Sequence, residues 1–231
     1  MIEKIKWIGV LLFLMGIIYG SHKLSVAVAA NLNLNQQQEE KLTVVIDSGH
    51  GGGDPGKIGV NNALEKDINL AIGEKLKTAL EKENIQVVLT RETDEMLAES
   101  KSEDMKKRVQ IMNDAKAKLV VSIHQNSYVT ERESGAQVFY YSNSEKGKEL
   151  ALVLQENFKK IDMDNRREAK ANDSYYILRH TDVPTVIVEC GFLTNPEEAE
   201  KLSGEEYQKQ VAEAVAKGIA KCLEYLNEYG N

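Results

Sequence analysis

The sequence has few cysteines, no excess of positive charge and no evident internal repeat. Its two cysteines are Cys190, in a predicted buried strand, and Cys222, in a predicted C-terminal helix. We expect both to be buried apolar thiols, which are favoured over a disulfide. Lysine and arginine number 29 against 36 aspartates and glutamates, a formal net charge of −7 at pH 7. A surface of this sign repels nucleic acid, so a nucleic-acid partner is not expected.

The first thirty residues have the pattern of an export signal. Lys4 and Lys6 precede an apolar run over 7–19, and small residues follow near Ala30. We therefore predict a secretory signal peptide over residues 1–30 with an Ala-x-Ala cleavage site. The run is short of the ~20 residues of a membrane span, but if it extends through Val28 the segment is instead an uncleaved membrane anchor. Membrane contact is expected only there.

The remaining sequence predicts one folded domain after a polar linker. Residues 31–41, NLNLNQQQEEK, have the composition of a linker, and 42–231 is long enough for a single α/β domain. Predicted strands lie at 43–47, 86–90, 118–123, 135–141 and 184–189, and predicted helices at 64–82, 101–116, 145–160 and 205–228. This alternation indicates a twisted, mostly parallel but mixed sheet of about six strands with helices on both faces. Antiparallel pairing is expected around 135–141.

A glycine-rich loop follows the first predicted strand. The stretch VVIDSGHGGGDPGKIG, residues 44–59, passes from β-branched residues directly into glycines that flank His50. Glycine lets the backbone approach a ligand closely and adopt positive φ. Open α/β sheets keep their sites at the carboxyl ends of strands. The loop therefore makes His50 a candidate ligand, although a tight turn with an incidental histidine explains the loop alone.

Two further candidate ligands occupy similar places. Glu65 begins an apolar-periodic stretch and is predicted in the first turn of a helix, where a carboxylate suits the helix dipole. His124 ends the buried strand LVVSIH. Two imidazoles and one carboxylate with an open fourth position are typical of a catalytic zinc site. We therefore predict one Zn²⁺, which lowers the pKa of its water to roughly 7 and polarises a carbonyl.

Glu189 is the predicted general base. It closes the apolar run PTVIVE at 184–189, where an unpartnered carboxylate is unusual. A water at the metal provides a partner whose proton Glu189 takes and later passes to a leaving amine. Cys190 is not expected to be a nucleophile, because successive strand residues point to opposite faces.

Four other residues are candidates for substrate binding or for supporting the ligands. Asp47 is predicted either to hold His50 through a hydrogen bond or to cap the turn. Asn126 either orients substrate or His124, or ends its strand in a turn. Arg91 either pairs with acidic neighbours or meets the carboxylates of a substrate peptide. Gln125 is predicted to add a hydrogen bond near the substrate.

These stretches together resemble the zinc-dependent N-acetylmuramoyl-L-alanine amidases of the amidase 3 family, which cut peptidoglycan. The matching segments occur in family order from about Thr43 to the end: VVIDSGHGGGDPG, LEKDINLAI, the TR at 90–91, LVVSIHQNS and VPTVIVECGFLTNPEE. The resemblance implies zinc ligands at His50, Glu65 and His124 and a catalytic carboxylate at Glu189. It implies hydrolysis of the amide between N-acetylmuramic acid and L-alanine.

Two positions depart from the common family pattern, and a short motif is similar to one branch. Many members have proline at Ser48 and a small apolar residue at Gln125. The His-Gln-Asn-Ser form, in a chain without a recognisable wall-binding repeat, is similar to the germination-specific amidases of spore formers. That similarity implies a spore-cortex substrate, with muramic δ-lactam formed by a second enzyme. It implies export to the cell wall or the forespore intermembrane space, with an accessory lipoprotein as a possible partner.

Two alternative functions remain open from the sequence. Ligand types do not choose the substrate, so a zinc hydrolase of another cell-wall amide has the same residues. A degenerate amidase that only binds peptidoglycan or a partner is disfavoured by the presence of all four expected residues.

Overall fold

The computed structural model describes residues 15–26 and 42–229, with side chains described as far as 225. Residues 15–26, inside the predicted leader, form an exposed helix. None of the helices within the described ranges is both long and apolar enough to cross a membrane. The rest of the predicted leader and the predicted linker at 31–41 lie outside the described residues. A separate compact unit begins at Leu42.

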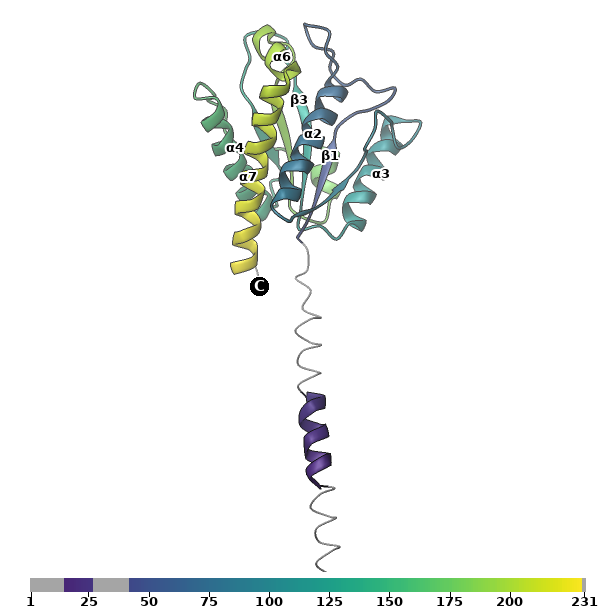
Figure 1. The fold of residues 1–231 in the computed structure, drawn as a ribbon. Helices are drawn as coiled ribbons and strands as arrows, with labels where there is room; N and C mark the ends of the chain where they lie inside the picture. The colour runs from purple at the N-terminus through teal and green to yellow at the C-terminus, as the bar shows by residue number, and fades with distance from the viewer. Residues whose placement is uncertain (1–14, 27–41, 230–231) are drawn as a thin grey trace, which may run out of the picture. The chain divides into compact units, whose positions relative to one another are not determined.

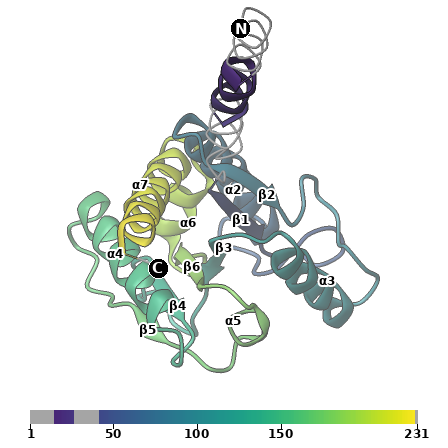
Figure 2. The ribbon, with the colours of Figure 1, turned by 90° about the horizontal axis from the view of Figure 1, so that it is seen from below.

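A six-stranded mixed sheet forms the centre of this unit (Figures 1 and 2). Its strands are β1 (Thr43–Ser48), β2 (Gln86–Leu89), β3 (Leu119–Asn126), β4 (Gln137–Tyr140), β5 (Lys170–Ala171) and β6 (Thr185–Phe192). Their spatial order is β2-β1-β3-β6-β4-β5. Strands β2, β1, β3 and β6 pair in parallel, whereas β4 pairs antiparallel with β6. The predicted mostly parallel sheet is confirmed, as is antiparallel pairing near 135–141.

Helices cover both faces of the sheet, as predicted. They are α2 (Glu65–Lys82), α3 (Lys101–Asp114), α4 (Glu145–Ile161), α5 (Tyr176–His180), α6 (Pro196–Ser203) and α7 (Glu205–Tyr229). Figure 2 shows α2, α4 and α7 on one side of the sheet and α3 and α5 on the other. The larger of the apolar cores lies between the sheet and α2, α4 and α7.

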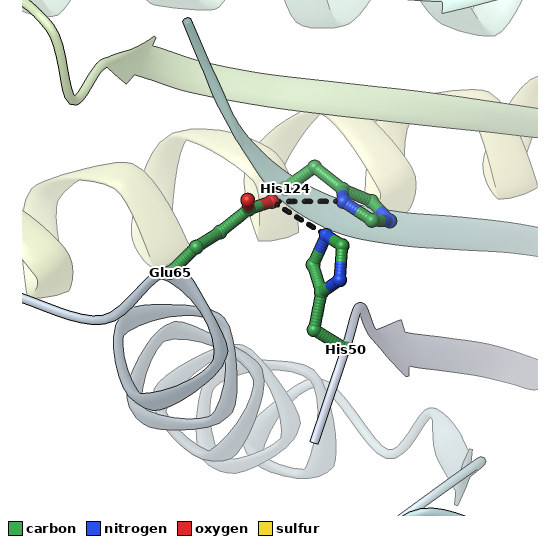
Figure 3. A group of neighbouring side chains, drawn as sticks. All are labelled: His50, Glu65 and His124. Carbon is green, nitrogen blue, oxygen red and sulfur yellow. Dashed lines mark hydrogen bonds and ion pairs between the residues drawn. The ribbon is translucent and has the colours of Figure 1, made fainter. Parts of the chain in front are cut away.

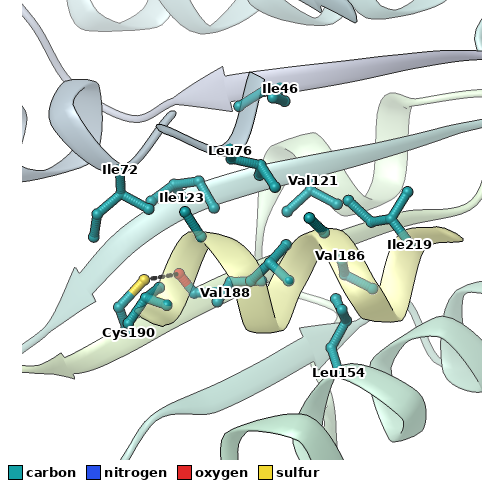
Figure 4. Packing of buried hydrophobic residues seen from close by; sticks show 14 of the residues in the cluster. Ile46, Ile72, Leu76, Val121, Ile123, Leu154, Val186, Val188, Cys190 and Ile219 are labelled. Carbon is teal, nitrogen blue, oxygen red and sulfur yellow. Dashed lines mark hydrogen bonds between the residues drawn. The ribbon is translucent and has the colours of Figure 1, made fainter. Parts of the chain in front are cut away.

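Strand alternation assigns the buried side chains to these two faces. In β1, Val44 and Ile46 join the larger core, whereas Val45 joins the smaller core under α3. In β6, Val188 and Cys190 face the larger core (Figure 4). Glu189 therefore points to the α3 and α5 face, since successive strand residues alternate. Cys190 is a buried free thiol, as expected, whereas Cys222 is also free but only partly buried.

Some predicted boundaries were wrong. Strands β3 and β6 were predicted to stop at 123 and 189 but run on to Asn126 and Phe192. The two strands continue to pair, with a register shift between His124 and Asn126. Backbone pairing therefore extends the strands beyond their apolar runs, and His124 and Glu189 lie inside strands.

Three short elements were not predicted. Strand β5 has two residues and α5 has five, so neither is long enough to show a periodic pattern. Helix α6 does carry a start signal, because Asn195 caps it through the Glu198 N–H and Pro196 occupies its first turn.

Core packing predicts a sharp contrast between two leucines of α4. Leu154 is fully buried against the sheet and α7, whereas Leu152 is 47% exposed. Leu154→Ala should lower the free energy of unfolding by about 2–5 kcal/mol, because it leaves a cavity. Leu152→Ala is the matched control, with a cost under about 1 kcal/mol. Urea denaturation measures both, and equal losses would contradict the assigned core.

Candidate metal centre

The three predicted ligands lie together at the carboxyl edge of the sheet. His50 comes from the loop after β1, Glu65 is the first residue of α2 and His124 lies near the end of β3 (Figure 3). Glu65 Oε1 is 3.2 Å from His50 Nε2 and 3.0 Å from His124 Nδ1. One ligand atom from each residue lies within 4.8 Å of the others. The parallel strands thus bring together residues that are distant in the sequence.

The glycine loop reaches this site through unusual backbone geometry. His50 itself has φ of 62°, a left-handed conformation that is uncommon for residues with a side chain. A Cβ added to Gly49 would lie 2.2 Å from the His124 ring. At Gly56, where φ is +67°, an added Cβ would lie 2.6 Å from Glu65 Oε2. Glycine at 49 and 56 therefore lets the loop pack directly against the candidate ligands.

Polar contacts orient two of the ligands. His50 Nδ1 lies 2.9 Å from Asp54 Oδ2, and Asp54 Oδ1 accepts from Lys101 Nζ at 2.6 Å. A proton on Nδ1 in this contact leaves Nε2 free to ligate, which is the usual role of a carboxylate behind a metal-bound histidine. Glu65 Oε2 accepts from the Lys57 N–H at 2.7 Å. The second carboxylate oxygen, Oε1, faces both imidazoles.

The donor set, and the two spacings from Glu65 Oε1 to the imidazole nitrogens, fit a tetrahedral cation such as zinc. Bonds of about 2.0–2.1 Å place tetrahedral ligand atoms about 3.3 Å apart, close to the observed 3.0 and 3.2 Å. Burial alone would raise the pKa of Glu65, but hydrogen bonds with His124 and His50 hold it well below its usual range. Burial alone would lower the pKa of His124, yet Glu65 raises it to about 9. Glu65 is therefore ionised and paired with the His124 ring, and a cation at this place would replace the imidazole proton.

Glu189 lies beside this cluster, on the neighbouring strand. It is the register partner of His124 in the β3–β6 pair, and it is 7% exposed. Its Oε1 accepts a 3.4 Å hydrogen bond from Tyr175 Oη, and its buried Oε2 has no hydrogen-bond partner among the described residues. Burial raises the pKa of Glu189 to about 7. A carboxylate of this kind is well suited to accept a proton near neutral pH.

A buried network beneath the loop involves Asp47. Its carboxylate accepts from Thr90, Ser122 and Arg108, rather than from His50, whose partner is Asp54. Arg108 also donates to the Ser48 carbonyl at 2.7 Å and to the His50 carbonyl at 2.6 Å. The network therefore fixes the backbone on both sides of Gly49.

The remaining candidates lie nearby in different roles. Arg91 is buried and donates to the carbonyls of Ser48, Gly49, Lys66 and Thr93, so it holds the loop and does not point to an acidic partner. Gln125 is 4% exposed; its Nε2 donates to Asn69 and its N–H donates to Glu65. Asn126 ends β3, and its Oδ1 accepts from the Ser127 N–H.

The sequence reasoning missed the supporting roles of Asp54 and Tyr175. Asp54 had a local signal, because it follows His50 by four residues inside the same glycine loop. Tyr175 had none, since it precedes a helix too short to be predicted.

Because Gly49 packs closely against His124, adding a single methyl group at Gly49 should weaken metal binding. Gly49→Ala should lower zinc affinity by at least about tenfold, because the new Cβ displaces the His124 ring. Gly53→Ala in the same loop is the matched control, since the nearest atom to its added Cβ is Met96 Sδ at 3.9 Å. Competition with a chelator of known affinity measures both variants. Equal affinities would rule out the packing described here.

The Asp47 network predicts a pH-dependent contribution to stability. Burial alone would raise the pKa of Asp47, but Arg108 and hydrogen bonds from Ser122 and Thr90 hold it below the usual value. Asp47→Asn should lower the free energy of unfolding by about 3 kcal/mol at pH 7, because Arg108 loses a buried partner. Asp94→Asn, which removes an exposed partner of Lys66, should cost less than about 1 kcal/mol.

The pH dependence of this difference follows from the lowered pKa. The stabilisation is complete above the unfolded-state pKa of about 3.9 and is lost as pH falls through the folded-state value. Denaturation curves should therefore show wild type and Asp47→Asn converging below about pH 4. A gap that stays constant to pH 2 would contradict the ionised state of Asp47.

Comparisons with known proteins identify the family of this chain. The amidase 3 family model, described as N-acetylmuramoyl-L-alanine amidase, matches residues 44–221. The germination-specific N-acetylmuramoyl-L-alanine amidase of Bacillus subtilis strain 168 is 34% identical over 196 residues, covering 81% of each chain.

Solved structures of amidases are also similar to this chain. The CwlD amidase from Clostridioides difficile, determined in complex with the GerS lipoprotein, shares 38% identity with a TM-score of 0.77, covering 80% of this chain and 100% of that one. The amidase AmiC2 of Nostoc punctiforme shares 36% identity with a TM-score of 0.72, covering 79% and 97%. The chain therefore belongs to the amidase 3 family of N-acetylmuramoyl-L-alanine amidases.

Proposed function

We propose that this protein is a zinc-dependent hydrolase of the amide between N-acetylmuramic acid and L-alanine in peptidoglycan. The observation that carries the proposal is the position of Glu189, a buried carboxylate with one unpartnered oxygen, next to His124 of the candidate metal centre. The family supplies the substrate class.

In this proposal His50 Nε2, Glu65 Oε1 and His124 Nδ1 hold one zinc ion. These are the atoms that converge in the structure. When bound, zinc supplies Lewis-acid polarisation of the scissile carbonyl and activation of a water molecule.

Glu189 carries the proton through the reaction. It accepts a proton from the attacking water, whose oxygen forms a bond to the carbonyl carbon. The carbon–nitrogen bond then breaks, and Glu189 delivers the proton to the leaving nitrogen of L-alanine. The products are the free lactyl carboxylate of muramic acid and a new amino terminus. Oε2 is the oxygen available for this transfer, because Oε1 is hydrogen-bonded to Tyr175.

We further propose a role in spore-cortex maturation. The support is the similarity to the germination-specific amidase of Bacillus subtilis and to the CwlD amidase. Stripping the peptide from muramic acid would then prepare the sugar for δ-lactam formation by a second enzyme. The CwlD structure contains the GerS lipoprotein, which supports an accessory lipoprotein as a partner of this chain.

The same reasoning supports export and the proposed division of the chain. Peptidoglycan lies outside the cytoplasmic membrane, so residues 1–30 are proposed as a signal peptide or anchor that places the enzyme in the cell wall or the forespore intermembrane space. Residues 31–41 serve as the linker and 42–231 as the amidase domain.

Variants at Glu189 and His124 separate catalysis from metal binding. Glu189→Ala should retain zinc and lose at least about 100-fold in turnover, because the general base is removed. His124→Ala should instead lower zinc occupancy, since a ligand is removed. The assay incubates full-length protein with peptidoglycan and counts new L-alanine amino termini, and elemental analysis measures zinc. His180→Ala, at an exposed histidine of α5, is the control for both readouts.

Several results would count against the proposal. Full turnover by Glu189→Ala would show that another group is the base. Unchanged zinc in His124→Ala would refute the ligand assignment. Release of other amino termini in place of L-alanine would identify a hydrolase of another cell-wall amide, and tight peptidoglycan binding without cleavage at any zinc level would identify a binding protein.

A further inference from the structure

Tyr175 is a half-buried tyrosine whose hydroxyl reaches the proposed base. It occupies the N-cap position of α5, and its Oη donates to Glu189 Oε1 at 3.4 Å. The other carboxylate oxygen of Glu189, Oε2, is buried and has no hydrogen-bond partner within the described part of the chain. The two oxygens of Glu189 are therefore in different environments.

The ring of Tyr175 is held from its other side. It packs edge-on against Phe139 of β4, with the ring centroids 5.7 Å apart and the planes inclined by 68°. It also belongs to a small apolar cluster with Leu178 and Ile187. This packing fixes the ring, so the hydroxyl is directed at Glu189 without needing a further contact.

The hydroxyl remains a donor over the working range of pH. Burial, together with the nearby charge of Glu189, raises the pKa of Tyr175 well above its usual value. A neutral phenol can donate its single proton to Oε1 and cannot compete as a base.

We propose that Tyr175 is a positioning residue, which holds Glu189 Oε1 so that Oε2 faces the reacting water. The inference rests on the proposed function of Glu189 as the base. Proton transfer depends strongly on the geometry of the acceptor. A carboxylate free to rotate presents the wrong oxygen part of the time, so the tyrosine acts on turnover and leaves substrate and metal binding alone.

Removing only the hydroxyl tests this role in the full-length protein. Tyr175→Phe should lower kcat about tenfold, the expected effect of losing one hydrogen bond to a charged group. KM for a soluble muramoyl peptide should stay within about twofold, with unchanged zinc content and an unchanged midpoint of thermal unfolding. Tyr141→Phe is the matched control, because Tyr141 packs against the same apolar cluster and its hydroxyl accepts from Asn143.

A second variant distinguishes the hydroxyl from the ring. Tyr175→Leu should lose about as much kcat as Tyr175→Phe and should also lower the unfolding midpoint, since the packing against Phe139 is lost. Full kcat in Tyr175→Phe would overturn the proposal, as would a loss of zinc or of thermal stability in that variant. Failure of the base assignment itself is recognised separately, because it appears as activity in Glu189→Ala.

Discussion

The parallel register of β1, β3 and β6 is the constraint on which the site depends. These three neighbours end at the same edge of the sheet, and each brings a candidate site residue there. His50 follows β1, while His124 and Glu189 are paired across β3 and β6. Glu65 joins them because α2 starts at the same edge (Figure 3). A shift of one residue in either pairing would turn its side chains to the opposite face.

The two faces of the sheet differ in the side chains that they bury. The side under α2, α4 and α7 holds a continuous apolar core (Figure 4). The opposite side carries Asp47, Ser122, His124 and Glu189, and polar contacts near the carboxyl edge lie there beside two smaller apolar clusters. Arg108 is the centre of this polar layer, since it joins Asp47 and Asp104 to the backbone of the glycine loop. Arg108 therefore holds the backbone of the glycine loop through hydrogen bonds, and Gly49 and Gly56 let the loop pack against His124 and Glu65.

Sequence alone predicts the parts of this structure that local patterns specify. Apolar runs predict the long strands, and the helical period predicts α2 and α7, because each buries one continuous stripe. The glycine loop and the carboxyl strand ends identify His50, His124 and Glu189 as candidates. Contacts between distant segments were not predictable in this way. Arg108 reaches a loop 58 residues away, and Tyr175 reaches Glu189 from the N-cap position of a helix of only five residues.

Because side chains alternate along β6, Cys190 lies in the larger core, and reaction of its thiol reports when that core opens. Cys190 is adjacent in the chain to the proposed base, yet its thiol is enclosed in the opposite core. Burial raises the pKa of Cys190, so the reactive thiolate is scarce in the folded state. Alkylating reagents that react with Cys190 therefore measure how often the larger core opens, from the face of the sheet opposite Glu189.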